Sequence, residues 1–128
     1  MLTIVPAYAA ILALMFIALS LRVIGLRRSS KVALGVGGHT ALERRIRVQA
    51  NFAEYVPLAL LLLAFAEFAG WPSWILHSLA VSLLAGRLAH AYGVSRTDED
   101  FRFRVTGMAM TFTVLGLTAC GLLISTIM

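Results

Sequence analysis

One face of a predicted helix carries the residues of this sequence best suited to chemistry. Four of them are spaced at i, i+4, i+7 and i+8, so they line one side of an α-helix: Arg47, Asn51, Glu54 and Tyr55. Arginine recognises a carboxylate through two parallel hydrogen bonds, and Glu54 is suited to an ammonium group. For Arg47 and Glu54 alone, the alternative is an internal ion pair that fixes helix packing. The spacing therefore predicts either a binding face for a small charged ligand or a packing contact.

The depth of these residues in a membrane favours the binding face. Residues 55–69 are apolar apart from Glu67, and as a helix these fifteen residues reach only about 22 Å, short of the roughly 30 Å hydrocarbon core. The turns that precede them must therefore lie at the edge of the hydrocarbon or inside it. By the same reasoning, residues 72–86 place Arg87 and His90 at a similar depth.

Positive charge at this level exceeds what one carboxylate can neutralise. Arg27 ends the first apolar segment and Arg104 stands at the start of the last, and both add to Arg87. Ionisable groups at this depth usually face a bundle interior or a wet cavity. Because an excess of guanidinium requires an anion, we expect a small, multiply acidic ligand whose amide groups bind Asn51 or Gln49.

Four apolar segments must position these groups. Spanning a membrane takes roughly 20 mostly apolar residues as helix. Of the 128 residues, 60% are hydrophobic and only 13% are charged. We predict an all-α membrane protein, an antiparallel bundle of four transmembrane helices at about 2–27, 41–70, 72–92 and 104–128, in one domain that covers residues 1–128. Residues 95–100 carry both charge signs and are predicted to form an exposed loop.

The basic residues are confined to one side of this arrangement. In a four-pass bundle, all eleven Lys and Arg residues fall on the side of the first and third connections. The positive-inside rule then predicts both termini outside and the basic loops, with the candidate site, in the cytoplasm. Orientation explains most of the net charge of +5, so we expect no nucleic acid partner. The three histidines are too scattered for a metal site, and we expect no metal.

A longer motif surrounds the chemical face. Residues 43–58 read ERRIRVQANFAEYVPL, which resembles the signature of the MAPEG superfamily, the membrane-associated proteins in eicosanoid and glutathione metabolism. Residues 20–28, SLRVIGLRR, are similar to the end of the first helix in leukotriene C synthases. Residues 86–90, GRLAH, are similar to the third-helix motif of prostaglandin E synthases. The sequence therefore resembles a small bacterial member of this superfamily over almost its whole length.

The resemblance implies a homotrimer that binds glutathione as co-substrate between adjacent subunits. The positions that match glutathione-binding residues of the family are Arg47, Asn51, Glu54 and Tyr55 in one subunit, Gln49 and Arg27 across the boundary, and Arg87 and His90 near the same ligand. Arg104 matches the arginine that stabilises the glutathione thiolate, and Arg102 is the alternative counterpart.

The resemblance also implies a function. We expect a membrane transferase or peroxidase of a bacterial inner membrane, in which the glutathione thiolate reacts with lipophilic electrophiles or lipid hydroperoxides that arrive through the lipid. The alternative is a non-catalytic lipid- or glutathione-binding membrane protein that resembles the lipoxygenase-activating member of the superfamily. A structural membrane protein with a vestigial site is the third hypothesis.

Overall fold

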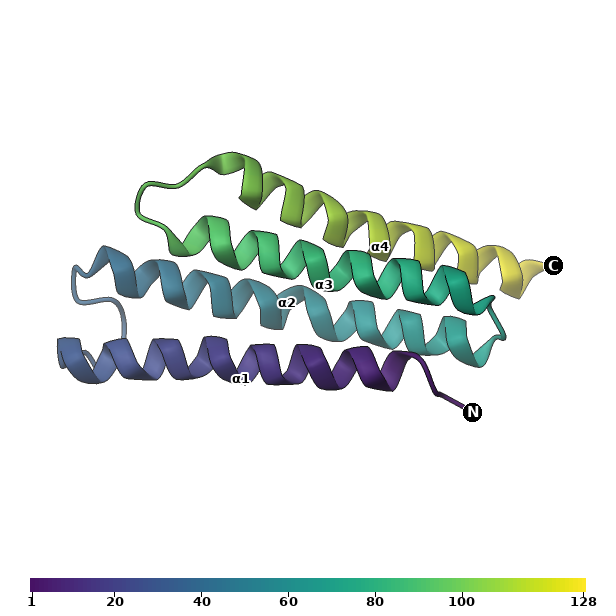
Figure 1. The fold of residues 1–128 in the computed structure, drawn as a ribbon, viewed down its shortest axis with the longest axis horizontal. Coiled ribbons are helices and arrows are strands. Elements are labelled where there is room, and N and C mark those ends of the chain that lie inside the picture. Colours follow the sequence, from purple (N-terminus) through teal and green to yellow (C-terminus); the bar gives the residue numbers. More distant parts are fainter.

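The computed structural model describes residues 1–128 as four α-helices joined by short connections (Figure 1). The helices are α1 (Val5–Ser30), α2 (Thr40–Phe68), α3 (Ser73–Ser95) and α4 (Phe101–Ile127). Successive helices run in opposite directions, so both termini and the α2–α3 turn lie at one end of the molecule. The two connections flanked by basic residues lie at the other end. The predicted four-helix antiparallel bundle is confirmed.

The first two helices end where the backbone leaves the right-handed helical region. α1 begins at Val5 rather than residue 2, and it continues to Ser30 instead of residue 27. Lys31 then takes a left-handed conformation, with a φ of 56°, and its N–H caps the last carbonyls of the helix. α2 stops at Phe68 instead of residue 70, and Gly70 supplies the positive φ of the tight turn that follows.

The last two helices are longer than predicted. α3 continues to Ser95 instead of residue 92. α4 begins at Phe101 rather than residue 104, because the Asp100 side chain accepts a hydrogen bond from the N–H of Arg102 and caps the helix. Arg104 therefore lies about one turn inside α4, and not at its start.

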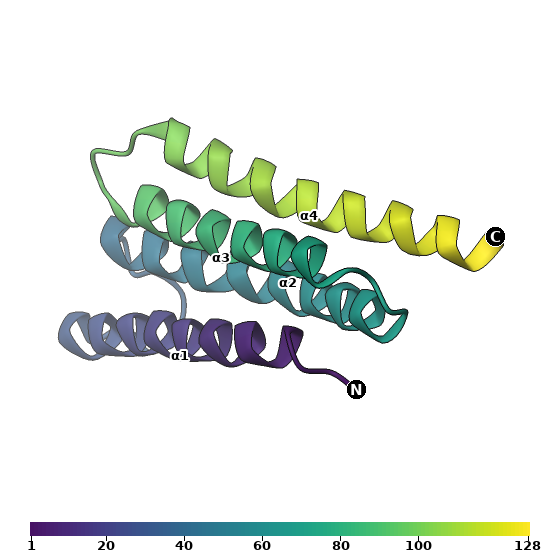
Figure 2. The ribbon, with the colours of Figure 1, turned by 45° about the vertical axis from the view of Figure 1, so that its right-hand side comes forward.

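The two middle helices form the centre of the bundle. α1 packs on α2 and α3, α4 packs on α3 and α2, and α1 and α4 do not meet (Figure 2). Buried aliphatic side chains from α1, α2 and α3 form the core, among them Leu12, Leu63 and Leu83. The central position of α3 buries two of its polar side chains, those of Arg87 and His90.

The outer surface of the bundle is apolar. Large hydrophobic side chains such as Leu14, Trp74 and Leu123 are well over half exposed, which suits contact with lipid. By length and composition, α1, α2 and α4 are able to cross a membrane. α3 carries His77 and Arg87, and it packs alongside both α2 and α4.

Two glycines let α3 and α4 come into backbone contact. A Cβ added at Gly107 would lie 2.5 Å from the carbonyl oxygen of Gly86 and 2.7 Å from the backbone nitrogen of His90. A Cβ added at Gly86 would lie 2.9 Å from the Cβ of Met110. Any side chain at either position would push the two helices apart.

The end of the bundle that holds the termini is closed by a carboxylate. Glu67, near the end of α2, accepts hydrogen bonds from three backbone N–H groups at the start of α1, those of Thr3 at 2.6 Å, Ile4 at 2.7 Å and Val5 at 2.8 Å. The first N–H groups of a helix have no partner inside it, so an outside acceptor stabilises them. Glu67 therefore fixes the position of α1 along the axis of α2.

Removal of this carboxylate should loosen the start of α1. We expect Glu67→Ala to destabilise the protein by about 1–2 kcal/mol, the range for loss of a helix cap. Amide hydrogen exchange at residues 3–5 should accelerate, while exchange in the middle of α1 stays unchanged. Glu67→Gln, which keeps one acceptor oxygen, should give an intermediate result. Equal exchange rates in all three proteins would show that the contact does not hold the helix.

Candidate functional site

A polar cavity lies between α2, α3 and α4, towards the end of the bundle that holds the two basic connections. Its volume is about 250 Å³. Six residues line it, namely Arg47, Asn51, His90, Val94, Arg104 and Met108. Four of these were predicted from the sequence as site residues, and the fold brings them together from three different helices. A cavity with two arginines, an amide and an imidazole on its wall is suited to a polar anion.

A second cavity of about 240 Å³ adjoins the first and is lined by three arginines and one glutamate. Arg47, Val94 and Arg104 line both cavities, and Arg44 and Glu43 appear only in the second. The two cavities share three lining residues and together form one arginine-rich groove. We call it the arginine groove, defined by the residues that line either cavity.

Arg104 and Arg102 differ in their relation to this groove. Arg104 lines both of its cavities, whereas Arg102 lines neither and its side chain is exposed. The two residues are two positions apart on α4, which separates them by about 200° around the helix. Of Arg102 and Arg104, only Arg104 is therefore placed to contact a ligand in the groove.

Arg87 lies behind the wall of the groove rather than on it. It is only 1% exposed, and it donates hydrogen bonds to Oδ1 of Asn51 and, at 3.3 Å, to the hydroxyl of Thr111. This contact fixes the Asn51 amide, because the oxygen points to Arg87 and no hydrogen bond within the chain occupies the NH₂ group. Arg87 therefore positions a groove residue and does not itself line either cavity.

His90 presents an unused polar atom. The residue is 4% exposed and lines the groove, and its Nδ1 has no hydrogen-bond partner within the chain. Buried side-chain polar atoms are in the large majority of cases hydrogen-bonded. Nδ1 of His90 is thus a buried polar atom that the chain itself leaves unsatisfied.

Arg47 and Glu54 do not form a packed internal pair. Their closest charged atoms are 3.9 Å apart, and the two side chains are 57% and 52% exposed. An exposed pair at this distance contributes little to stability. On the same face, Tyr55 packs edge to face against Phe112 of α4, with ring centroids 5.4 Å apart. Arg47 and Glu54 therefore remain free to contact a ligand or a neighbouring molecule.

Gln49 and Arg27 lie away from the groove of their own chain. Gln49 is two residues from Arg47, so it points about 200° away around α2. Arg27 is held by its own loop, where Nη1 donates to the carbonyl of Gly35 at 2.8 Å and to that of Val32 at 3.3 Å. A single chain therefore brings neither residue to the ligand.

Sequence reasoning missed Glu99, which contacts two arginines of the groove without lining either cavity. Residues 95–100 were expected to be exposed, but the Glu99 side chain is only 4% exposed and lies between Arg44 and Arg104. Its neighbours Asp98 and Asp100 are exposed as expected. The available signal was the acidic run itself, since clustered arginines at the same end of the bundle need a counter-charge.

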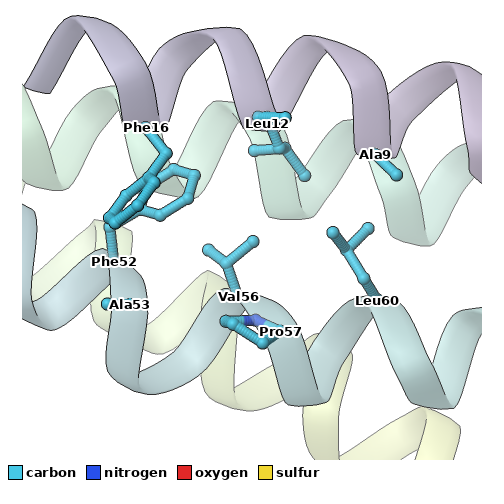
Figure 3. A pocket seen from close by; sticks show the side chains of 9 residues that line it. Ala9, Leu12, Phe16, Phe52, Ala53, Val56, Pro57 and Leu60 are labelled. Atoms are coloured by element: carbon cyan, nitrogen blue, oxygen red, sulfur yellow. The ribbon is translucent and has the colours of Figure 1, made fainter. Parts of the chain in front are cut away.

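An apolar groove lies on the opposite face of α2, against α1 (Figure 3). It measures about 260 Å³, and eight of the nine residues that line it are hydrophobic. The rings of Phe16 and Phe52 stack at its edge, with centroids 5.5 Å apart, and Pro57 lies on its floor. A space of this kind accommodates an acyl chain or another lipophile.

Comparison with known proteins identifies the family. The family model described as MAPEG family matches residues 5–124. The chain belongs to the MAPEG family. Two relatives support the assignment, both described as inner membrane protein YecN, one from Escherichia coli strain K12 and one from Escherichia coli O6:H1. Each is 40% identical over 108 residues, which covers 84% of this chain and 81% of the relative.

Membership of the MAPEG family agrees with the apolar surface and the long apolar helices of the bundle. The protein is an integral membrane protein with a MAPEG four-helix fold. The name of the relatives states a membrane and no reaction. The chemistry of this MAPEG protein therefore has to be argued from the arginine groove.

Proposed function

We propose that this MAPEG protein is a glutathione-dependent membrane transferase or peroxidase. The observation that carries the proposal is the arginine groove, in which Arg47 and Arg104 lie on one wall with Asn51 and His90. Glutathione has two carboxylates, one ammonium group, two amides and a thiol. Arginines of the groove suit its carboxylates, Asn51 suits a peptide amide, and Glu54 beside Arg47 suits its ammonium group.

Each part of the tripeptide has a suitable partner. Arg47 is placed to bind a carboxylate, and Glu54 beside it to bind the ammonium group. The NH₂ group of Asn51, which Arg87 leaves free, donates to a peptide carbonyl. Arg104 lines both cavities, and in this proposal it is the residue that stabilises the thiolate. A guanidinium there favours the thiolate and lowers the thiol pKa from about 8.5.

The thiolate then reacts with a lipophile. In conjugation, its sulfur forms a C–S bond with an electrophilic carbon, and the leaving group departs with the electron pair of the bond that breaks. In the peroxidase reaction, two glutathione molecules are oxidised to the disulfide, and a lipid hydroperoxide is reduced to an alcohol and water. Both reactions need the lipophile to reach the groove from the bilayer, which the apolar outer surface permits.

The proposed active form is a homotrimer in a bacterial inner membrane, with both termini outside and the groove on the cytoplasmic side. The exposure of Arg47 and Glu54, and the position of Gln49 on the other face of α2, support a site that a neighbouring subunit completes. The basic connections at one end support the orientation. The YecN relatives are named as inner membrane proteins, which supports the location.

Calorimetric titration of the purified protein with glutathione tests the proposal. We expect saturable binding to wild type and strongly weakened binding to Glu54→Ala and Asn51→Ala. Glu67→Gln is the matched control, because it removes an acidic group from the same helix at the opposite end of the bundle. Absence of binding to wild type at millimolar glutathione would refute the glutathione site.

The apolar groove between α1 and α2 favours a second candidate function, a non-catalytic lipid-binding protein. The transferase or peroxidase converts its substrate, whereas the lipid-binding protein does not. A protein that binds a lipid but forms no thioether with a model aryl halide, and reduces no lipid hydroperoxide, would support the second.

A further inference from the structure

The carboxylate of Glu99 is enclosed between two arginines. Its Oε2 lies 2.8 Å from Nη1 of Arg44 on α2, and its Oε1 lies 2.7 Å from Nε of Arg104 on α4. The Arg44 contact is a hydrogen-bonded ion pair, whereas the Arg104 contact is a close ion pair without hydrogen-bond alignment. A buried carboxylate is strongly unfavourable unless charges of opposite sign surround it. The position of Glu99 is therefore set by both arginines together.

Hydrogen bonds within the α3–α4 connection hold the backbone on both sides of Glu99. Arg96 donates to both carboxylate oxygens of Asp98, at 3.1 and 2.8 Å, and to the hydroxyl of Tyr92 at 2.6 Å. These hydrogen bonds hold the pKa of Asp98 below its ordinary value, so the ion pair is present at neutral pH. On the other side, Asp100 caps α4. The backbone is thus anchored immediately before and after Glu99.

The contact with Glu99 restrains Arg104 where it lines the arginine groove. Nε lies 2.7 Å from Oε1 of the carboxylate, and the guanidinium carbon lies 5.6 Å from the ring centroid of Phe101. No hydrogen bond within the chain involves either terminal nitrogen of Arg104, and Arg104 lines both cavities. The end of the guanidinium is therefore left for an anion. Because Glu99 lies beside Nε, a ligand does not have to displace it.

We propose that Glu99 is the positioning residue of Arg104, which holds the guanidinium through Nε so that its two terminal nitrogens face the anion in the arginine groove. The proposal rests on the proposed function for the identity of that anion, the glutathione thiolate. Arg44 has a supporting part, since it pairs with the second carboxylate oxygen and also donates to the carbonyl of Val94 at 3.1 Å.

A double-mutant cycle tests the anchoring without any ligand. Thermal unfolding midpoints of the full-length protein are compared for Glu99→Ala, Arg104→Ala and the double variant. We expect the two shifts not to add, because each single change already removes the contact. Asp100→Asn with Arg104→Ala is the control cycle, where the shifts should add, since Asn also caps a helix. Additive shifts for Glu99 and Arg104 would overturn the proposal, whatever glutathione does.

Kinetics with glutathione test whether the contact between Glu99 and Arg104 is needed for catalysis. We expect Glu99→Gln to lower kcat at least tenfold with KM for glutathione within threefold of wild type, because a neutral amide does not replace an ion pair. The pKa of the bound thiol, followed by thiolate absorbance, should rise towards that of free glutathione. Asp100→Asn should change kcat less than twofold. The Gln variant keeps the size of the side chain, so the test stands even where Glu99→Ala does not fold.

The opposite sign of the pKa change would overturn the proposal. If Glu99 only opposed the thiolate by its charge, its removal would lower the thiol pKa and raise kcat. An unchanged kcat would overturn it as well. A wild-type protein that binds no glutathione would refute the proposed function, and the double-mutant cycle would still decide whether Glu99 holds Arg104.

Discussion

Replacement of Arg104 by alanine is expected to reduce the rate of glutathione conjugation by about 10²–10³, the loss found when one preorganised donor to a developing anion is removed. Arg104 lines both cavities of the arginine groove, and no bond within the chain occupies its terminal nitrogens. The loss should lie in kcat, because the thiolate is no longer favoured at neutral pH. Steady-state kinetics with a model aryl halide, at saturating glutathione, measures it.

Arg102→Ala is the matched control for this experiment. It removes the same charge two residues earlier on α4, from an exposed side chain that lines neither cavity. We expect its kcat to stay within about twofold of wild type, which is a difference in barrier below 1 kcal/mol. A large loss in Arg102→Ala with full activity in Arg104→Ala would reverse the assignment of the two arginines.

Replacement of Gly107 by alanine is expected to destabilise the protein by about 3 kcal/mol, the upper part of the usual range for overpacking. The added methyl group would lie 2.5 Å from the carbonyl oxygen of Gly86 and 2.7 Å from the backbone nitrogen of His90. Backbone atoms cannot turn aside as a flexible side chain can, so α4 must move away from α3. The movement would also open the groove, because His90 and Arg104 lie on the two helices concerned.

Gly116→Ala on the same helix is the control. A Cβ at Gly116 meets nothing within 4 Å, and alanine is the better helix former, so we expect no loss of stability. Thermal unfolding of both variants in the same detergent gives the comparison. Equal midpoints would show that the close approach of α3 and α4 does not limit stability.

The sequence by itself determined the four helices and the helical face that carries the candidate site residues. Hydropathy and helical periodicity are local properties, and they predicted four helices to within three residues at every end. The spacing of Arg47, Asn51 and Glu54 placed them on one face, since 3.6 residues make a turn whatever the rest of the chain does. The family signature in residues 43–58 is equally local, and the match to the MAPEG family model confirms it.

Only the tertiary structure decided which residues meet. The same spacing rule sets Arg102 and Arg104 on opposite sides of α4, but the packing of α4 on α2 and α3 selects the side that faces the groove. It also places Arg87 behind Asn51 instead of in contact with a ligand.

The burial of Glu99 is the clearest case of this second kind. Its neighbours Asp98 and Asp100 have the same charge and the same local surroundings in the sequence, yet they are exposed. Glu99 is buried because the α3–α4 connection folds back to a point where Arg44 of α2 and Arg104 of α4 converge. That convergence joins residues about sixty positions apart along the chain, and no local pattern contains it.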